Sequence, residues 1–179
     1  MLLLTGAPGV GKTTVIAKTA VALNANNFKV GGMISREIRQ SGTRVGFEIL
    51  DLTTGKRGFL AHIDQKNGPR VGKYRVNLED LDKVGAQAIV NALDTCDVIA
   101  IDEIGPMELH SETFKQATKK ALESCKLVIV VVHWKTKDKL ITEATNRNDA
   151  KTFNVTPENR EGLEEKLVDE ATAILKSKY

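Results

Sequence analysis

The sequence predicts an α/β protein of three layers, in which helices cover both faces of a mostly parallel β-sheet. Three observations support this fold class. Segments with helical spacing of apolar residues alternate with short strand-like segments along the chain. Two of the strand-like segments, 98–101 and 127–132, are apolar throughout, which is typical of strands buried on both faces. From 30 to 63 the pattern changes to alternation and turns, which indicates an antiparallel hairpin insertion.

The chain opens with a predicted strand, a loop and a helix. Residues 1–5 form an apolar run of strand length, and residues 12–23 place their apolar side chains on one face of a helix. The asparagine-rich segment 24–27 ends this helix, and Gly31 and Gly32 permit a bend after it.

The hairpin region follows. Segments 33–39 and 44–52 are strand-like, and the turn residues at 40–43 join them. A third strand is expected at 57–62. Residues 65–75 form a basic loop that contains two glycines, and we expect it to close over a bound ligand.

The middle of the chain alternates between helices and strands. Asn77 can cap a helix that spans 78–93, and Ser111 can cap the next helix. Apolar strands are expected at 97–104 and 127–132.

The last part of the chain contains a short helix at 138–145 and a final strand at 151–155. Thr156, Pro157 and Glu158 predict the start of an amphipathic helix, because proline is favoured in the first helical turn.

Size and charge limit the possible function classes. The chain has 179 residues, and we expect residues 1–179 to form a single domain. The net charge of +3 is small, and no block of five or more like charges occurs, so nucleic acid is not expected as a partner. A monomer is the default expectation.

The cysteines and the first residues indicate a cytoplasmic protein. Cys96 and Cys125 lie far apart without metal-ligand spacing, and both are expected to be buried in a reducing compartment. The apolar start at residues 1–4 is too short to span a membrane and lacks the marks of a signal peptide, so no membrane association is expected.

A glycine-rich segment after the first strand matches the P-loop pattern G-x-x-x-x-G-K-[ST] in full. Its glycines allow backbone N–H groups to point at phosphate oxygens, and the following helix adds its N-terminal dipole. We expect Lys12 to bridge the outer phosphates, Thr13 to ligate Mg²⁺ and Thr14 to donate to an inner phosphate. The predicted nucleotide-binding residues are Gly6, Ala7, Pro8, Gly9, Val10, Gly11, Lys12, Thr13 and Thr14.

Two carboxylates end the apolar strand that leads to Asp102 and Glu103. A carboxylate at the carboxyl end of a strand next to the P-loop strand can reach the metal through water, and we assign this role to Asp102. Glu103 is then placed to orient and polarise the attacking water. The structural alternative for Glu103 is an ion pair or a cap for the loop at 104–106.

Transition-state charge also needs a cation. We select Arg147, because it lies between a short helix and the last strand, near the expected carboxyl edge of the sheet. The other candidates are Arg39, Arg44, Arg70 and Arg160.

Other signals are weak. The three histidines, His62, His110 and His133, show no metal-ligand grouping and are interpreted as structural or surface residues. Trp134 is interpreted as a packing residue. Residues 146–149 have the wrong order for a guanine-reading segment, so no guanine preference is predicted.

Longer matches extend well beyond the P-loop. They are Glu37 with Arg39, Arg44-Val45-Gly46-Phe47, Arg70-Val71-Gly72-Lys73-Tyr74, Asp102-Glu103-Ile104-Gly105-Pro106-Met107-Glu108-Leu109, Asn146-Arg147 with Asp149, Phe153-Asn154-Val155-Thr156 and Glu158-Asn159-Arg160. In these segments the chain resembles the thermophilic-type nucleoside-triphosphatase family, whose animal members are called cancer-related nucleoside-triphosphatase. Arg36 and the pair His133-Trp134 depart from the family pattern.

This resemblance implies a RecA-like P-loop fold and slow, magnesium-dependent hydrolysis of ATP, GTP and other nucleoside triphosphates to the diphosphate and phosphate. It implies a magnesium site at Thr13 and Asp102 and a catalytic role for Glu103. Two alternatives stay open. One is a kinase for a nucleotide or another small molecule, and the other is a nucleotide-dependent switch or nucleic-acid-associated ATPase.

Overall fold

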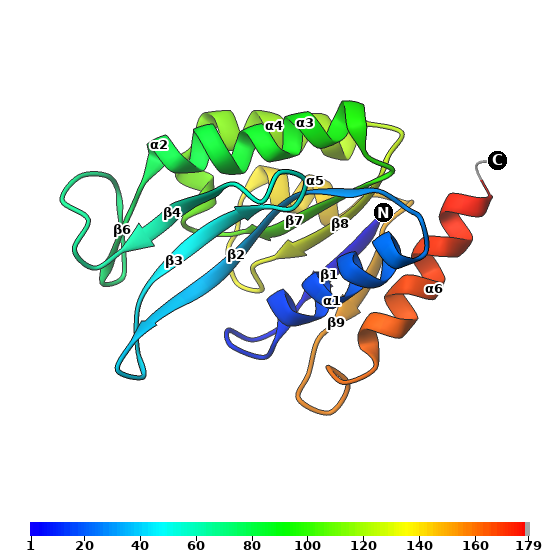
Figure 1. Cartoon of the computed structure of the whole chain (residues 1–179), viewed down its shortest axis with the longest axis horizontal. Coiled ribbons are helices and arrows are strands. Elements are labelled where there is room, and N and C mark those ends of the chain that lie inside the picture. The colour runs from blue at the N-terminus through cyan, green and yellow to red at the C-terminus, as the bar shows by residue number, and fades with distance from the viewer. Residues whose placement is uncertain (178–179) are drawn as a thin grey trace.

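Nine strands within residues 1–177, the part of the chain that the computed structural model describes, form one sheet (Figure 1). Their order across the sheet is β5-β6-β4-β3-β2-β7-β8-β1-β9. The strands are β1 (Leu2–Thr5), β2 (Val30–Gln40), β3 (Thr43–Asp51), β4 (Arg57–His62), β5 (Arg70–Val71), β6 (Tyr74–Val76), β7 (Val98–Ile104), β8 (Leu127–Val132) and β9 (Lys151–Asn154).

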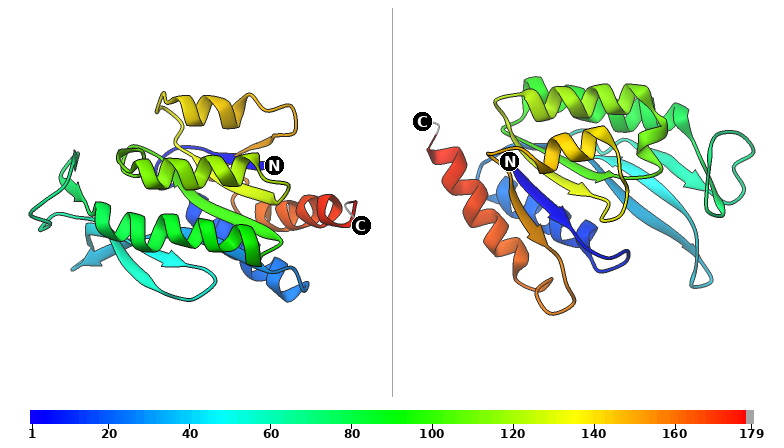
Figure 2. Two further views of the ribbon diagram at one scale, coloured as in Figure 1. Left: turned by 90° about the horizontal axis from the view of Figure 1, so that it is seen from above. Right: turned by 180° about the vertical axis from the view of Figure 1, so that it is seen from behind.

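Helices cover both faces of this sheet, which confirms the predicted three-layer α/β fold (Figures 1 and 2). On one face lie α1 (Lys12–Ala25) and α6 (Leu163–Lys176). On the other face lie the helical segment α2 (Leu78–Asp80), η1 (Leu81–Ala86) and α3 (Gln87–Thr95), then the short η2 (Glu108–His110), α4 (Glu112–Glu123) and α5 (Lys139–Thr145). None of the helices in residues 1–177 combines the length and apolarity needed to cross a membrane.

The first strand shows why both faces are covered. Leu2, Leu3 and Leu4 are all buried, and successive side chains of a strand point to opposite faces. Leu2 and Leu4 belong to the core under α1 and α6, whereas Leu3 belongs to the core under α3 and α4. A continuous apolar run is therefore the pattern that this position in the sheet requires.

The predicted hairpin insertion extends the sheet at one edge. Strand β2 pairs parallel with β7 and antiparallel with β3, so it joins the parallel part of the sheet to the antiparallel part. Ser41 and Gly42 make the β2–β3 turn with positive φ, as a two-residue hairpin turn requires. The predicted basic loop at 65–75 contains β5 and the start of β6.

Gly31 and Gly32 do not bend the chain as predicted, because both lie inside β2. They pair with Ile99 and Ala100 of β7. A Cβ atom on Gly32 would lie 2.1 Å from the carbonyl oxygen of Ala100, so this pairing of strands requires glycine.

Two helix predictions need correction. The helix expected at 78–93 runs to Thr95 and contains the π-helical turn η1. The last helix begins at Leu163 and not at Thr156. Asn159 explains the delay, because its side chain accepts a hydrogen bond from the Thr156 amide and donates one to the Asn154 carbonyl, which holds this segment in turns.

The caps and cysteines give a mixed result. Asn77 and Ser111 cap their helices as predicted, since the side chain of each accepts a hydrogen bond from a backbone amide three residues later. Cys96 is buried as expected, but Cys125 is exposed.

Candidate nucleotide-binding and hydrolytic site

The P-loop and the acidic pair meet at the carboxyl edge of the parallel strands. β1 ends at the P-loop, and β7 ends at Asp102 and Glu103. The two strands were predicted to be neighbours, but β8 pairs with both and lies between them. Two strand spacings separate them, which is about 10 Å.

The P-loop conformation depends on its glycines. Gly11 precedes α1 with φ of 114°, in a region that other residues avoid. A Cβ atom on Gly6 would lie 2.5 Å from the carbonyl oxygen of Val155, so the loop approaches the segment after β9 closely. Both features leave the backbone amides at the start of α1 available to an anion.

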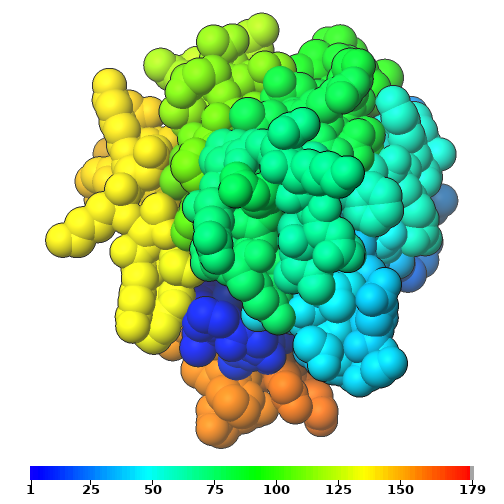
Figure 3. All heavy atoms as spheres, turned by 90° about the vertical axis from the view of Figure 1, so that its left-hand side faces the viewer, coloured from blue at the N-terminus to red at the C-terminus, as the bar shows by residue number. Residues whose placement is uncertain are grey.

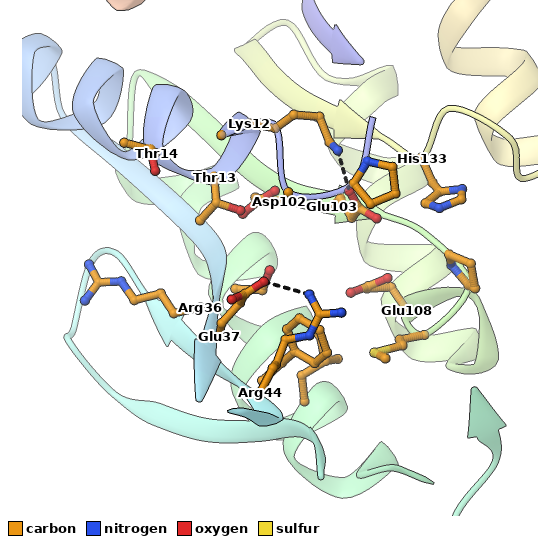
Figure 4. Close-up of a pocket in the computed structure, with 18 of the residues that line it drawn as sticks. Lys12, Thr13, Thr14, Arg36, Glu37, Arg44, Asp102, Glu103, Glu108 and His133 are labelled. Carbon is orange, nitrogen blue, oxygen red and sulfur yellow. Dashed lines mark hydrogen bonds and ion pairs between the residues drawn. The ribbon is translucent and has the colours of Figure 1, made fainter. Parts of the chain in front are cut away.

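The ammonium of Lys12 lies at the centre of the loop. Its side chain is buried, and Nζ donates to the carbonyl oxygens of Gly6 at 3.0 Å and Ala7 at 3.2 Å. Nζ also lies 3.9 Å from Oε2 of Glu103 (Figure 4). The predicted phosphate-binding lysine and the predicted catalytic glutamate are therefore brought together.

Asp102 is buried and lies beside Thr13, the other residue of the predicted magnesium site (Figure 4). Burial raises the pKa of its carboxyl to about 6, although hydrogen bonding from Thr13 and Ser35 and the charge of Lys12 act in the opposite direction. Its Oδ2 atom has no hydrogen-bond partner among the described residues. A buried carboxylate oxygen without a partner, next to a threonine hydroxyl, fits a hard divalent cation.

Glu103 shares the cavity with a second buried acid, Glu108. Burial and the charge of Asp102 raise the pKa of Glu103 to about 7, and the charge of Lys12 opposes them. Burial and the charge of Glu103 raise the pKa of Glu108 well above its usual range. A Cβ atom on Gly105 would lie 2.7 Å from Oε1 of Glu103 and 3.1 Å from Oε2 of Glu108, so both carboxyls border this glycine. Sequence reasoning had not singled out Glu108.

The wall opposite the P-loop is formed by an ion cluster on the β2–β3 hairpin. Arg44 donates to Oε1 of Glu37 at 2.7 Å (Figure 4). It also donates to the hydroxyl of Tyr74 at 3.0 Å. Arg39 donates to Oε2 of Glu37 at 2.7 Å. The guanidinium of Arg44 also lies over the ring of Phe47, 5.1 Å from its centroid. These contacts hold the side chains of Arg39 and Arg44 in place on this wall of the site.

Lys12, Asp102, Glu103, Glu108 and the Glu37–Arg39–Arg44 cluster line one cavity of about 580 Å³. Figure 3 shows the face on which it opens, where the blue P-loop end of the chain lies between the orange segment after β9, the yellow segment after β8 and the cyan β2–β3 hairpin. The lining residues are Pro8, Gly9, Gly11, Lys12, Thr13, Thr14, Ser35, Arg36, Glu37, Arg39, Arg44, Phe47, Leu60, Val71, Asp102, Glu103, Pro106, Met107, Glu108 and His133.

The structure does not bring Arg147 to this cavity. Arg147 forms an ion pair with Asp149 just before β9, and the carbonyl oxygen of Asp149 accepts a hydrogen bond from the amino group of Met1. Arg147 therefore lies at the amino ends of β1 and β9, about one strand length, roughly 13 Å, from the P-loop edge. The expectation that it lies near the carboxyl edge is corrected.

The other predicted arginines divide between three places. Arg39 and Arg44 line the main cavity. Arg70 donates to the carbonyl oxygen of Gly72 within the β5–β6 hairpin and does not line the cavity. Arg160 lines a second cavity of about 200 Å³ on the outer side of the P-loop, together with Gly11, Thr14, Val15, Lys18 and Glu161.

His133 is a cavity residue that the interpretation of the histidines missed. It directly follows β8, just as Asp102 and Glu103 end β7. A polar residue directly after a fully apolar parallel strand was the available signal. Its neighbour Trp134 is 48 % exposed, with Nζ of Lys135 4.2 Å from the ring centroid, so it does not serve core packing as predicted.

Comparisons with known proteins agree with this geometry. A family model described as NTPase matches residues 1–168. The chain is 45% identical over 174 residues to a nucleoside-triphosphatase THEP1 of Thermofilum pendens, covering 97% of this chain and 96% of that protein. It is 48% identical over 167 residues to a protein of the same name from Methanosarcina barkeri, covering 93% of this chain and 94% of the relative.

Solved structures give the same result. The crystal structure of THEP1 from the hyperthermophile Aquifex aeolicus superimposes with a TM-score of 0.85 at 28% identity, covering 96% of this chain and 99% of that chain. The solution structure of a human cancer-related nucleoside triphosphatase superimposes with a TM-score of 0.81 at 35% identity, covering 96% and 97%. The chain is therefore a member of the NTPase family of P-loop nucleoside-triphosphatases.

Proposed function

We propose that this protein hydrolyses nucleoside triphosphates to the diphosphate and phosphate in a Mg²⁺-dependent reaction. One observation carries the proposal. A P-loop lysine, a threonine beside a buried aspartate and a glutamate near Lys12 converge in a single cavity. Phosphoryl transfer to water needs these three parts: a phosphate-binding site, a cation-binding site and a group that positions the nucleophile.

The magnesium would be held by the Thr13 hydroxyl and by Asp102. The described residues contain no group of three or more His, Cys, Asp or Glu side chains that could hold a metal by themselves. This fits Mg²⁺, which is commonly held by one or two carboxylates together with substrate phosphates and water. When bound, the ion would neutralise charge on the phosphate oxygens.

Glu103 is the residue that we assign to the attacking water. Its raised pKa of about 7 places its proton affinity near neutral pH, where a general base is most effective. The ammonium of Lys12 lies close to Glu103 and would bind phosphate oxygens, so Glu103 would lie next to the terminal phosphate of the substrate. Arg39 and Arg44, which line the cavity together with Arg36, replace Arg147 as candidates for stabilising transition-state charge.

Broad base tolerance is supported by the second cavity. It adjoins Gly11 and Thr14, at the side of the P-loop where the inner phosphate and the nucleoside would lie. Lys18, Arg160 and Glu161 line it with long charged side chains. A guanidinium can stack on any base, because every base presents a π-face. We therefore propose that ATP, GTP, CTP and UTP are all substrates.

The test is phosphate release from the four triphosphates, with Mg²⁺ or with excess EDTA, for the unaltered protein, Glu103→Gln and Glu143→Gln. Glu143 lies on α5 beside Lys139, outside the cavity, and serves as the matched control. We expect Glu103→Gln to lower kcat by about 100-fold or more while nucleotide binding persists, and Glu143→Gln to leave it unchanged. EDTA should stop phosphate release.

A small-molecule kinase is the second candidate, favoured by the extent of the cavity. Beyond Glu103 the cavity continues to Phe47, Leu60 and Val71, which provides space next to the terminal phosphate for an acceptor. Tight nucleotide binding without phosphate release from any triphosphate would contradict the hydrolase and favour this alternative.

A further inference from the structure

His133 stands at the terminal-phosphate end of the site. It follows β8, the strand between the P-loop strand and the acidic strand, and its amide donates to the carbonyl oxygen of Ile104 at 3.0 Å. Figure 4 shows Lys12 and Glu103 between His133 on one side and Thr13 and Asp102 on the other. The cavity that would take the nucleoside lies at the opposite side of the P-loop.

Hydrogen bonds fix the tautomer of this imidazole. Nδ1 lies 3.4 Å from the amide nitrogen of Lys135 and 3.2 Å from that of Thr136. A backbone N–H can only donate, so Nδ1 is an acceptor without a proton, and the Thr136 hydroxyl at 2.7 Å donates to it as well. In the neutral ring the proton must then be on Nε2.

The surroundings of the ring disfavour its protonation. Burial lowers the pKa of His133, and the positive charges of Lys12 and Lys135 lower it further. No described residue accepts a hydrogen bond from Nε2. The site therefore contains an N–H donor that is oriented by the loop, borders the cavity and has no acceptor among the described residues.

We propose that His133 recognises the terminal phosphate of the substrate by donating its Nε2–H to a γ-phosphate oxygen. The proposal rests on the proposed function, since it names a specificity-determining contact of the same site. The contact exists for a triphosphate and is lost for a diphosphate. His133 therefore makes the enzyme prefer its substrate over its product.

The test measures the affinities of Mg·ADP and of the non-hydrolysable analogue Mg·AMP-PNP by calorimetry, for the unaltered protein and for His133→Asn. In this variant the amide oxygen can replace Nδ1 as the acceptor for the loop, while the donor at Nε2 is removed. We expect AMP-PNP to bind about tenfold or more weakly, as for a lost hydrogen bond to a charged group. ADP affinity should stay within about twofold, which also reports that the variant folds.

A second readout needs no variant. Trp134 is the single tryptophan of the chain and adjoins His133. AMP-PNP should therefore change its fluorescence more than ADP does in the unaltered protein. Equal changes with both nucleotides would contradict a contact confined to the terminal phosphate.

The failures of the two proposals are distinguishable. Equal weakening of ADP and AMP-PNP in His133→Asn, or weakening of neither, would overturn the role of His133 while hydrolysis by the unaltered protein stands. Failure of the unaltered protein to bind either nucleotide would overturn both the role of His133 and the proposed function.

Discussion

Replacing Gly32, where β2 packs against β7, tests how the fold supports the site. Gly32 has φ of 100°, and a Cβ atom there would lie 2.1 Å from the carbonyl oxygen of Ala100 and 3.0 Å from its nitrogen. Gly42, in the hairpin turn, has φ of 79° and nothing within 4 Å of the corresponding position. The two glycines therefore both have positive φ but differ in their surroundings.

The magnitudes follow from this difference. An alanine with positive φ destabilises the folded protein by roughly 1–2 kcal/mol relative to glycine. Alanine also lowers the conformational entropy of the unfolded chain, which offsets about 0.4–1 kcal/mol of this loss. Gly42→Ala should therefore lower the free energy of unfolding by about 1 kcal/mol. Gly32→Ala adds a steric clash with a strand backbone, which costs about 1–3 kcal/mol more, so its total effect is about 2–4 kcal/mol.

The assay is urea unfolding followed by circular dichroism, with linear extrapolation to water. Phosphate release is measured in parallel. Ala100 lies two residues before Asp102, so a displacement of β7 by Gly32→Ala should also lower kcat, whereas Gly42→Ala should not. Equal losses of stability in the two variants, or full activity in Gly32→Ala, would refute this reasoning.

Three further predictions concern single side chains. Burial alone would raise the pKa of Glu37, but hydrogen bonds and charges from Arg44 and Arg39 hold it below its usual value. The Glu37 carboxylate therefore stabilises the folded protein at pH values above its pKa in the unfolded chain. This contribution is lost as the pH falls through the pKa of Glu37 in the folded protein. Glu37→Gln should show a smaller loss of stability on acidification in thermal melts at pH 7 and pH 4, and an identical acid response would contradict the ion cluster. Arg147→Ala should leave kcat and KM within about twofold of the values for the unaltered protein, because the side chain lies outside the cavity. A large drop in kcat would show that Arg147 does take part in catalysis. Phe114→Ala should lower the free energy of unfolding in urea by about 3–5 kcal/mol, because Phe114 of α4 is fully buried in the core, and a loss below about 1 kcal/mol would argue against this core.

Features that depend on near neighbours in the chain were predictable. The P-loop was recognised because its chemistry needs contiguous glycines followed by Lys12 and Thr13, and the strands before Asp102 and His133 were recognised because burial on both faces removes polar residues. The caps at Asn77 and Ser111 were predictable for the same reason, since a cap acts over three residues.

Which side chains line the site depends on the direction of the strands and on their order. Arg147 precedes β9 and lies at the amino edge of the sheet, whereas His133 follows β8 and lies at the carboxyl edge. The delayed start of α6 was also missed, although its cause is local: side-chain hydrogen bonds of Asn159 replace the helical turn that Pro157 suggested.

The amino-acid sequence alone was sufficient to identify the α/β fold class and the P-loop, and to predict the carboxylates that we assign to the same site, because each is a contiguous pattern with a local physical cause. Only the tertiary structure showed that β8 lies between β1 and β7, that Glu37, Arg44 and Glu108 complete the cavity, and that Arg147 lies outside it. The reason is that strand order brings distant segments to one edge of the sheet, and no local pattern of residues encodes that order.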